Sequence, residues 1–303
     1  IQSVNAIALG DIMSFLEVKA HSYRKHSILR KYLGACRVFS DKYQNFTYID
    51  THGGTGEVID YETKKHGDGS VLVAAKLQPS FPCYVVEIDP DNYKLLQQST
   101  QKYPNVTLYH GDCNEKIDDI LKMIPRGRKF VFCFLDPDGL MYGAYGQLKW
   151  ETVEKIAKFP RTEVLINIPT FTIMRCAGVV KDYPEASSSL KMASHLTNFY
   201  GSDSWTDMDP GDYRGLARLY ISERLTDYKY KGAILIRSVL TRGPLYYLVY
   251  GSNSIRGGEI MRDIVKKEWV DIMGMYPITR HGYKTDKEWL DAQYPIQSFI
   301  FED

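Results

Sequence analysis

The fold of this chain is decided by one stretch of its sequence, Tyr48-Ile49-Asp50-Thr51-His52-Gly53-Gly54-Thr55-Gly56. Residues 46–50 form a short β-prone run that ends in an acid, and the glycines after it favour a tight turn. Glycine leaves the backbone bare, so a ligand can approach it closely. The stretch therefore predicts a strand that leads into a ligand-binding turn.

Phosphate ligands do not suit this turn. A GxGxxG fingerprint that starts at Gly54 would need glycine or alanine at position 59, which is Ile59, and the GK[ST] of a P-loop is absent. The carboxylate of Asp50 would repel a pyrophosphate, whereas it suits a ligand that carries an ammonium and a sulfonium. S-adenosylmethionine (SAM) is such a ligand, and an NAD-type oxidoreductase is the weaker alternative.

Strands and helices alternate along the chain on both sides of the turn. Apolar strands are expected at residues 46–50, 84–88, 106–109, 130–135 and 164–168, with helices between them at 70–77, 91–102, 114–123 and 150–158. Parallel neighbours need a crossover, which is usually a helix, so this alternation predicts a mainly parallel sheet with helices on both faces.

The pattern changes late in the chain. A helix is expected at residues 213–225, followed by strands at 233–240 and 245–250 that only four residues join. So short a connection makes these two strands antiparallel. The predicted fold class is thus a three-layer α/β, Rossmann-like class I methyltransferase fold, a mainly parallel seven-stranded sheet with an antiparallel final strand.

The domain organisation follows from the same pattern. Residues 1–45 are predicted to be an N-terminal helical segment, because apolar residues recur at helical spacing over 12–39. A methyltransferase-like domain is expected at 46–270, with an extra loop at 57–68 and a helical insertion at 170–212, which is too long for an ordinary connection. Residues 271–303 are predicted to be a C-terminal extension.

Composition restricts the class of protein. The 38 Lys and Arg against 37 Asp and Glu leave a formal net charge of +1, so no global basic footprint points to nucleic acid. No apolar run reaches the ~20 residues that cross a bilayer, and we expect a cytoplasmic protein without a membrane partner. The five cysteines form no CxxC pair, so we predict reduced thiols and no metal site.

Acidic residues follow four of the expected strands. Asp50, Glu87, Asp112 and Asp136 come at strand ends, where ligands of open α/β sheets bind, and the last three are spaced by 25 and 24 residues. An acid at the end of the second strand can accept hydrogen bonds from ribose hydroxyls. The residues predicted to bind the cofactor are Asp50, Thr51, His52, Gly53, Gly54, Gly56, Glu87, Ile88, Asp112, Cys113 and Asp136.

Asp136 is also the predicted catalytic residue, because a buried carboxylate without a partner is costly and so has little reason to exist for stability. Asp138 and Asn167 are the next catalytic candidates. For the substrate we expect Phe171 to stack on a base, with a core position as the alternative, and Arg175 to bind an anionic group.

The order of these motifs resembles that of the three-Cys-motif partner proteins. The resemblance rests on Tyr48-Ile49-Asp50 with its glycine loop, Gly67-Asp68-Gly69-Ser70, Val86-Glu87-Ile88-Asp89, Gly111-Asp112-Cys113-Asn114, Asp136-Pro137-Asp138-Gly139-Leu140 and Leu165-Ile166-Asn167-Ile168-Pro169. It implies a SAM-methyltransferase-like fold, encoded near a radical-SAM-like protein that bears three cysteines and without a well-defined substrate, so we expect the protein to act with or beside that partner. Asp136-Pro137 is also similar to the start of the DPPY signature of amino-methyltransferases, in which the acid and the adjacent backbone carbonyl orient a planar amine.

The sequence leaves two functions open, a nucleic-acid or protein methyltransferase and a SAM-binding partner subunit without catalysis. A nucleic-acid substrate is favoured by the basic residues Arg24, Lys25, Arg30 and Lys31 and by 23 tyrosines that could stack on bases. The alternative for this basic stretch is a solvated helix face.

Overall fold

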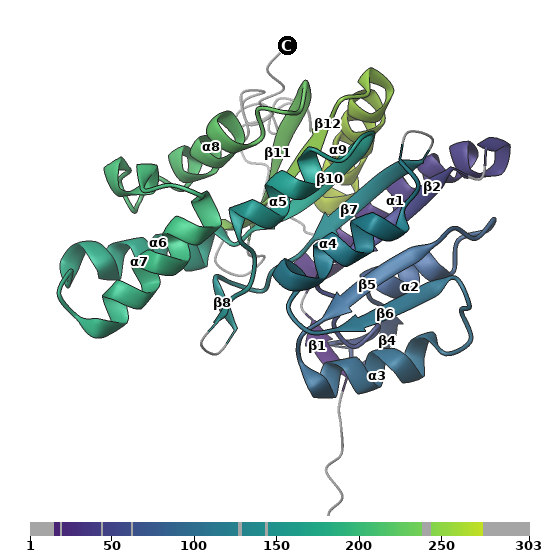
Figure 1. Cartoon of the computed structure of the whole chain (residues 1–303), viewed down its shortest axis with the longest axis horizontal. Coiled ribbons are helices and arrows are strands. Elements are labelled where there is room, and N and C mark those ends of the chain that lie inside the picture. Colours follow the sequence, from purple (N-terminus) through teal and green to yellow (C-terminus); the bar gives the residue numbers. More distant parts are fainter. Residues whose placement is uncertain are drawn as a thin grey trace, which may run out of the picture.

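The centre of the protein is a seven-stranded sheet in the order β11-β12-β10-β7-β2-β5-β6 (Figure 1). The structure is a computed structural model that describes residues 15–18, 20–43, 45–61, 63–126, 129–142, 145–237 and 244–274. The strands of the sheet are β2 (Phe46–Asp50), β5 (Cys83–Glu87), β6 (Val106–His110), β7 (Phe130–Leu135), β10 (Thr162–Ile168), β11 (Tyr230–Arg237) and β12 (Pro244–Ser252).

Strand directions in this sheet confirm the prediction. β2 pairs in parallel with β5 and β7, β5 with β6, and β7 with β10. β12 runs antiparallel to both of its neighbours, β10 and β11. The sheet is therefore mainly parallel, and β12, the last strand among the described residues, is the antiparallel one.

Helices cover both faces of the sheet, because its central strands are apolar on both sides. On β7, Val131, Cys133 and Leu135 pack towards one face and Phe132 and Phe134 towards the other. The first face is covered by α4 (Cys113–Met123), α5 (Trp150–Ala157) and α8 (Tyr213–Arg224), and the second by α1 (Ala20–Tyr43), α2 (Ser70–Ala75), α3 (Pro90–Thr100) and α9 (Ile255–Gly274). Within the described residues, no helix has the length and apolar character needed to cross a membrane.

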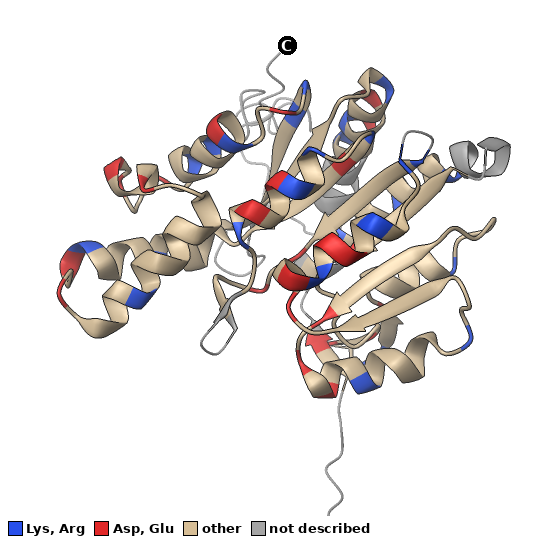
Figure 2. Ribbon diagram, viewed as in Figure 1, with Lys and Arg blue, Asp and Glu red and all other residues tan. Residues whose placement is uncertain are grey.

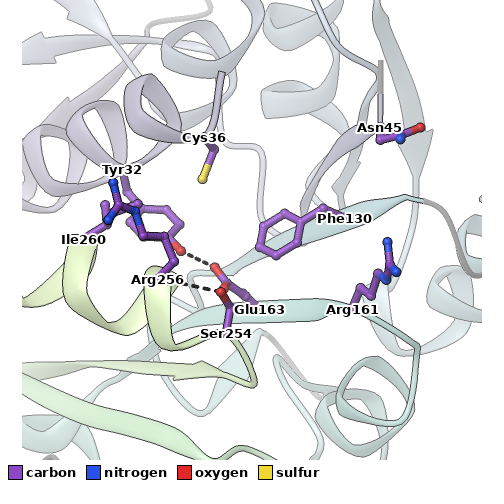
Figure 3. Close-up of a pocket in the computed structure, with 10 residues that line it drawn as sticks. Tyr32, Cys36, Asn45, Phe130, Arg161, Glu163, Ser254, Arg256 and Ile260 are labelled. Atoms are coloured by element: carbon purple, nitrogen blue, oxygen red, sulfur yellow. Dashed lines mark hydrogen bonds between the residues drawn. The ribbon is translucent and has the colours of Figure 1, made fainter. Parts of the chain in front are cut away.

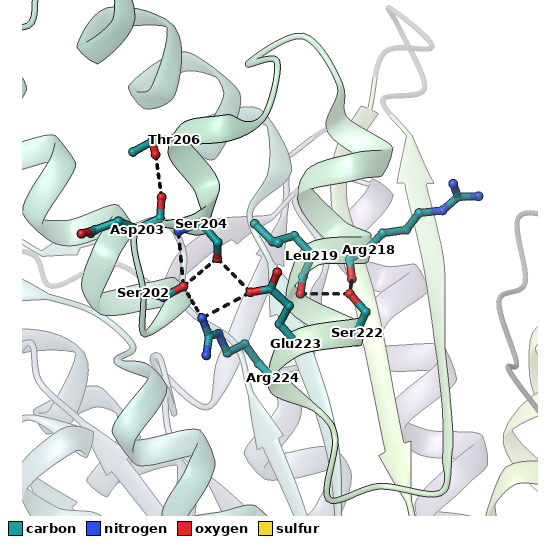
Figure 4. A network of polar contacts seen from close by, with 9 residues as sticks. All are labelled: Ser202, Asp203, Ser204, Thr206, Arg218, Leu219, Ser222, Glu223 and Arg224. Carbon is teal, nitrogen blue, oxygen red and sulfur yellow. Dashed lines mark hydrogen bonds and ion pairs between the residues drawn. The ribbon is translucent and has the colours of Figure 1, made fainter.

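The predicted helical insertion after β10 consists of α6 (Thr170–Asp182), α7 (Ser187–Tyr200) and the short 3-10 helix η1 (Ser204–Asp207). In Figure 1, α6 and α7 extend away from the body of the protein. Polar contacts hold the end of this segment to α8 (Figure 4): the Ser204 hydroxyl donates to Glu223 at 2.8 Å, and Arg224 donates to the hydroxyl of Ser202.

Two predictions for the region before α2 are wrong. Leu16–Val18 is strand β1 and not helix, because it pairs in parallel with β3 (Glu57–Asp60), and the predicted loop at 57–68 contains β3 and β4 (His66–Asp68) as an antiparallel pair. A further hairpin joins β8 (Met141–Tyr142) and β9 (Tyr145–Gly146). Residues 1–14 and 275–303, which include most of the predicted C-terminal extension, lie outside the described residues.

A buried polar network connects the sheet to α1, and Gly257 of α9 packs against it. The carboxylate of Glu163, at the start of β10, accepts hydrogen bonds from the hydroxyls of Tyr32 and Ser252, and the Tyr32 hydroxyl lies 2.7 Å from that of Tyr250. Burial raises the pKa of Glu163. Figure 3 shows Glu163 in the wall of a cavity at the amino ends of β7 and β10, the edge opposite to the strand-end acids.

Gly257→Ala tests how tightly this network is packed. A Cβ at position 257 would lie 2.6 Å from the Tyr250 hydroxyl and would collide with Glu163, so we expect a loss of about 1–3 kcal/mol in the free energy of unfolding. Gly178→Ala, in α6, is the matched control. Position 178 has open space where a Cβ would lie, so the free energy of unfolding should increase by about 0.5–1 kcal/mol. Denaturant unfolding measures both, and equal effects would show that the network tolerates displacement.

Candidate functional site

A cleft lies at the carboxyl edge of the sheet, where the strand-end acids were predicted to meet. Its wall is formed by the start of α1, the glycine turn after β2, the segment after β5 and the segment after β7. Acidic residues gather where β5 ends and α3 and α4 begin (Figure 2). Even so, within the described part of the chain no three His, Cys, Asp or Glu side chains are placed to hold a metal ion.

The glycine turn gives the cleft a base of bare backbone. Gly54 has a φ of +59°, in the left-handed region that favours glycine. Gly53 packs directly on β5, since a Cβ there would lie 2.6 Å from Val85 Cγ1. Gly53, Gly54, Thr55 and Gly56 all line the cleft, and three of these four positions bring no side chain into it.

Asp50 stabilises the glycine turn from the interior of the protein. Its side chain is fully buried and accepts hydrogen bonds from the Tyr48 hydroxyl at 2.9 Å, from the His52 amide at 3.1 Å and from Ser70. Burial raises the pKa of Asp50 to about 7. Neither Asp50 nor the buried Thr51 lines the cleft, whereas His52 does. The structure thus gives Asp50 the role of shaping the turn.

Glu87 joins the glycine turn to the end of β5. One carboxylate oxygen accepts from the Gly54 amide at 2.7 Å, and the other from the Asp89 amide at 2.8 Å. Burial raises the pKa of Glu87 to about 7. Glu87, Ile88 and Asp89 all line the cleft. Each carboxylate oxygen has a second acceptor site, so Glu87 can still accept a hydrogen bond from a ligand hydroxyl.

The next strand end has a different role. Asp112 is the N-cap of α4 and accepts from the Asn114 amide at 2.8 Å and from its side chain at 2.7 Å. Cys113 is buried, and its thiol donates to the backbone carbonyl of Gln147 at 3.4 Å. Neither residue lines the cleft, although Gln147 does. In the structure, the acid after β6 therefore satisfies one backbone amide at the start of α4.

Asp136 lines the cleft at the end of β7, but it is not the unpartnered carboxylate that was predicted. Lys25 of α1 forms an ion pair with one oxygen, and Asn167 Nδ2 donates to the other at 2.9 Å. Asn167 also donates to the Pro137 carbonyl at 3.2 Å. The buried Asn167 does not line the cleft, so it acts on the site by holding Asp136.

Lys25 and His26 are cleft residues that the predicted site did not contain. Both are buried, so Lys25 does not belong to a solvated basic face, and the same stretch also has Arg30 near Asp68 at 3.5 Å. The sequence did contain a signal. Lys25 stands one helical turn before Leu29, which is fully buried, so this charge continues an apolar face.

The predicted substrate residues lie outside the cleft on α6. Phe171 is 56% exposed, which excludes the alternative core position, and Arg175 is exposed one helical turn further on. Asp138 is exposed and does line the cleft. The segment after β7 approaches the start of α6, since a Cβ at Gly139 would lie 3.9 Å from Thr172 Cγ2.

Comparisons with known proteins support the fold. No family model and no curated protein matches the sequence. Among solved structures, the chain is similar to a Legionella pneumophila protein of the family model DUF519, with a TM-score of 0.51 and 12% identity over 84% of this chain and 92% of that chain.

Two further similar structures are of methyltransferase-fold proteins whose crystals contain S-adenosylmethionine, called AdoMet or SAM. TYW2 of M. jannaschii in complex with AdoMet gives a TM-score of 0.38 and 11% identity, covering 77% of this chain and 75% of that chain. The O-methyltransferase TomG of Streptomyces achromogenes in complex with SAM gives a TM-score of 0.39 and 12% identity, covering 76% of this chain and 80% of that chain. The likeness concerns the fold alone. The strand order and directions of the sheet are those of the predicted class I methyltransferase-like α/β fold.

His26 makes the stability of the protein depend on pH. Burial lowers its pKa from 6.5 to about 4, so the unfolded chain takes up a proton before the folded protein does. The stabilisation is complete above pH 6.5 and is lost as the pH falls towards 4. Between pH 7 and pH 5, the wild type should therefore lose about 2 kcal/mol more of its free energy of unfolding than His26→Gln.

Denaturant unfolding at the two pH values measures this difference. The raised pKa values of Asp50 and Glu87 act in the opposite direction, but they are common to both proteins and cancel in the comparison. His110→Gln, at an exposed position on β6, is the control and should follow the wild type. A parallel loss in wild type and His26→Gln would contradict a neutral, buried His26.

Proposed function

We propose that this protein is a SAM-dependent methyltransferase. The observation that carries the proposal is Glu87, a carboxylate at the end of the strand after the glycine turn, which lines the cleft beside that turn. An acid at this place in an open α/β sheet suits the two hydroxyls of a ribose. The turn lacks the third glycine of the dinucleotide fingerprint, which favours SAM over NAD.

The residues of the cleft fit the parts of this cofactor. Glu87 would accept the ribose hydroxyls, Ile88 would contact the adenine, and the backbone of Gly53 and Gly54 leaves room where side chains would intrude. The buried Nδ1 of His26, which has no hydrogen-bond partner, marks a polar group in the cleft wall that a ligand would satisfy. Asp50 would act indirectly, by holding the turn.

When bound, SAM supplies a methyl group that is already activated by the sulfonium. The protein then has to position the acceptor and orient its lone pair. Asp136 is the residue for this task because it lies at the end of the central strand β7 and lines the cleft. Asn167 positions the Asp136 carboxylate, and the exposed Asp138 lines the same cleft.

The acceptor that best suits this arrangement is a planar amine, which the Asp136 carboxylate and the Pro137 carbonyl would orient. Phe171 and Arg175, exposed on the neighbouring helix α6, would contact the rest of a nucleic-acid or other anionic substrate by stacking and by charge. The proposal includes a cytoplasmic location and the partner that the sequence resemblance implies, a three-Cys-motif radical-SAM-like protein.

A second candidate function is that of a SAM-binding partner subunit without its own catalysis. It is favoured by one observation, that both oxygens of Asp136 already have partners, Lys25 and Asn167. The two functions share the cofactor residues and differ only in whether Asp136 becomes available to an acceptor.

Calorimetry tests the cofactor assignment. The purified protein should bind S-adenosylhomocysteine, because Glu87 and the bare glycine turn match its ribose and its amino-acid part. It should not bind NAD, because the carboxylates of the cleft repel a pyrophosphate and no third glycine contacts it. Tight binding of NAD with no binding of S-adenosylhomocysteine would overturn the assignment.

Asp136→Asn tests the catalytic assignment. We expect the variant to keep its fold and to bind SAM, but to transfer methyl groups about 100-fold more slowly or worse, since an orienting carboxylate is removed. The assay follows tritiated methyl groups into the RNA, DNA and protein of a cell extract, with a candidate three-Cys-motif protein added or withheld.

The outcomes of this assay separate the two functions. If the wild type binds SAM but labels no fraction, the partner-subunit function replaces the enzyme function. If wild type and Asp136→Asn label equally well, Asp136 is not catalytic. Asp118→Asn, an exposed acid on α4 that pairs with Lys155 at 2.7 Å, is the control and should label like the wild type.

A further inference from the structure

The charges in the wall of the cleft are strongly unequal. Four carboxylates line it, from Glu87, Asp89, Asp136 and Asp138. Among the described residues that line the cleft, Lys25 is the one Lys or Arg. The two histidines in the wall, His26 and His52, are neutral at pH 7 because burial lowers the pKa of each to about 4.

This inequality restricts how the proposed cofactor can bind. SAM carries an ammonium and a sulfonium, which suit acidic surroundings, and one carboxylate, which does not. A carboxylate that enters a partly buried cleft needs a cation or hydrogen-bond donors. Lys25 supplies the charge, and the adjacent His26 has a buried Nδ1 without a hydrogen-bond partner.

Lys25 is not available for a ligand in the present arrangement, because its ammonium is paired with Asp136. The free space in the cleft is about 130 Å³, well below the ~300–1,000 Å³ that is usual for small-molecule sites. A sulfonium close to Asp136 would also repel the ammonium of Lys25. Both considerations favour a movement of the Lys25 side chain when the cofactor enters.

We propose that Lys25 and His26 bind the carboxylate of SAM, and that Lys25 leaves Asp136 to do so. The inference rests on the proposed function and adds a coupling to it. In the cofactor-free protein, Lys25 occupies the carboxylate that would orient the acceptor. In the cofactor-bound protein, Lys25 is held by the cofactor and Asp136 is exposed to the acceptor. Binding is then ordered, with the cofactor before the acceptor.

Decarboxylated SAM tests the carboxylate contact directly, because it keeps the ammonium and the sulfonium and lacks only the carboxylate. By calorimetry, the wild type should bind SAM about 10-fold or more tightly than decarboxylated SAM, as expected for hydrogen bonds between charged groups. Lys25→Met should lose this preference, because the substitution weakens the binding of SAM and leaves the binding of decarboxylated SAM unchanged. Lys155→Met, which breaks an exposed ion pair with Asp118, is the matched control and should keep it.

Variants of Asp136 test the exchange of partners. Asp136→Asn removes the competitor for Lys25, so it should bind SAM at least about 3-fold more tightly than the wild type and decarboxylated SAM no more tightly. Lys25→Met leaves Asp136 partly buried without its cation, which destabilises the fold and so calls for a second variant. The double variant Lys25→Met, Asp136→Asn removes both charges. Compared with Asp136→Asn, it should bind SAM about 10-fold more weakly and bind decarboxylated SAM with the same affinity.

The results distinguish this inference from the proposed function. If the wild type binds neither SAM nor decarboxylated SAM, the cofactor assignment itself fails. If it binds both equally well, or if the double variant weakens both to the same degree, the cofactor assignment stands and the role of Lys25 is wrong. If Asp136→Asn binds SAM no more tightly than the wild type, the exchange is wrong and Lys25 does not pass between the two carboxylates.

Discussion

The ion pair between Lys25 and Asp136 connects the N-terminal helix to the middle of the sheet, and the geometry of the cleft depends on it. Both side chains are mostly buried, 10% and 12% exposed, so both lose hydration when the pair forms. Such a pair is weak evidence for stability, because apolar residues of similar volume often stabilise a fold as well or better. Its place in the wall of the cleft is therefore better explained by chemistry than by stability.

The framework of the fold could be predicted because its signals are local. On β7 the apolar run Phe130–Leu135 is buried on both faces of the sheet, and the short connection between β11 and β12 dictates their direction. β1 could not be predicted in this way. Leu16–Val18 is a strand because β3, some 40 residues further on, offers it an edge. A pairing between segments so distant in sequence produces no periodic pattern in the sequence of either strand.

The same limit explains which site residues could be predicted. An acid after a strand that precedes a helix occupies a ligand-binding position and an N-cap position at once, and its sequence does not separate the two. Asp112 caps α4, Asp50 holds the turn from below, and Glu87 and Asp136 line the cleft. Lys25 was not predicted as a site residue. Its partner, Asp136, is determined by how α1 packs against the sheet, which the sequence of α1 does not show.

The two edges of the sheet each contain a buried carboxylate, and the two carboxylates have different kinds of partner. At the amino edge, the hydroxyls of Tyr32 and Ser252 donate to Glu163, which burial keeps at a raised pKa. Both side chains are buried in the packing of a helix and a strand, so their hydroxyls have little freedom to move away from Glu163. At the carboxyl edge, Asp136 has an ammonium on a flexible four-carbon stem as its partner. A partner of that kind can turn to another anion while α1 stays in place, which makes the carboxyl edge the one suited to binding and exchange.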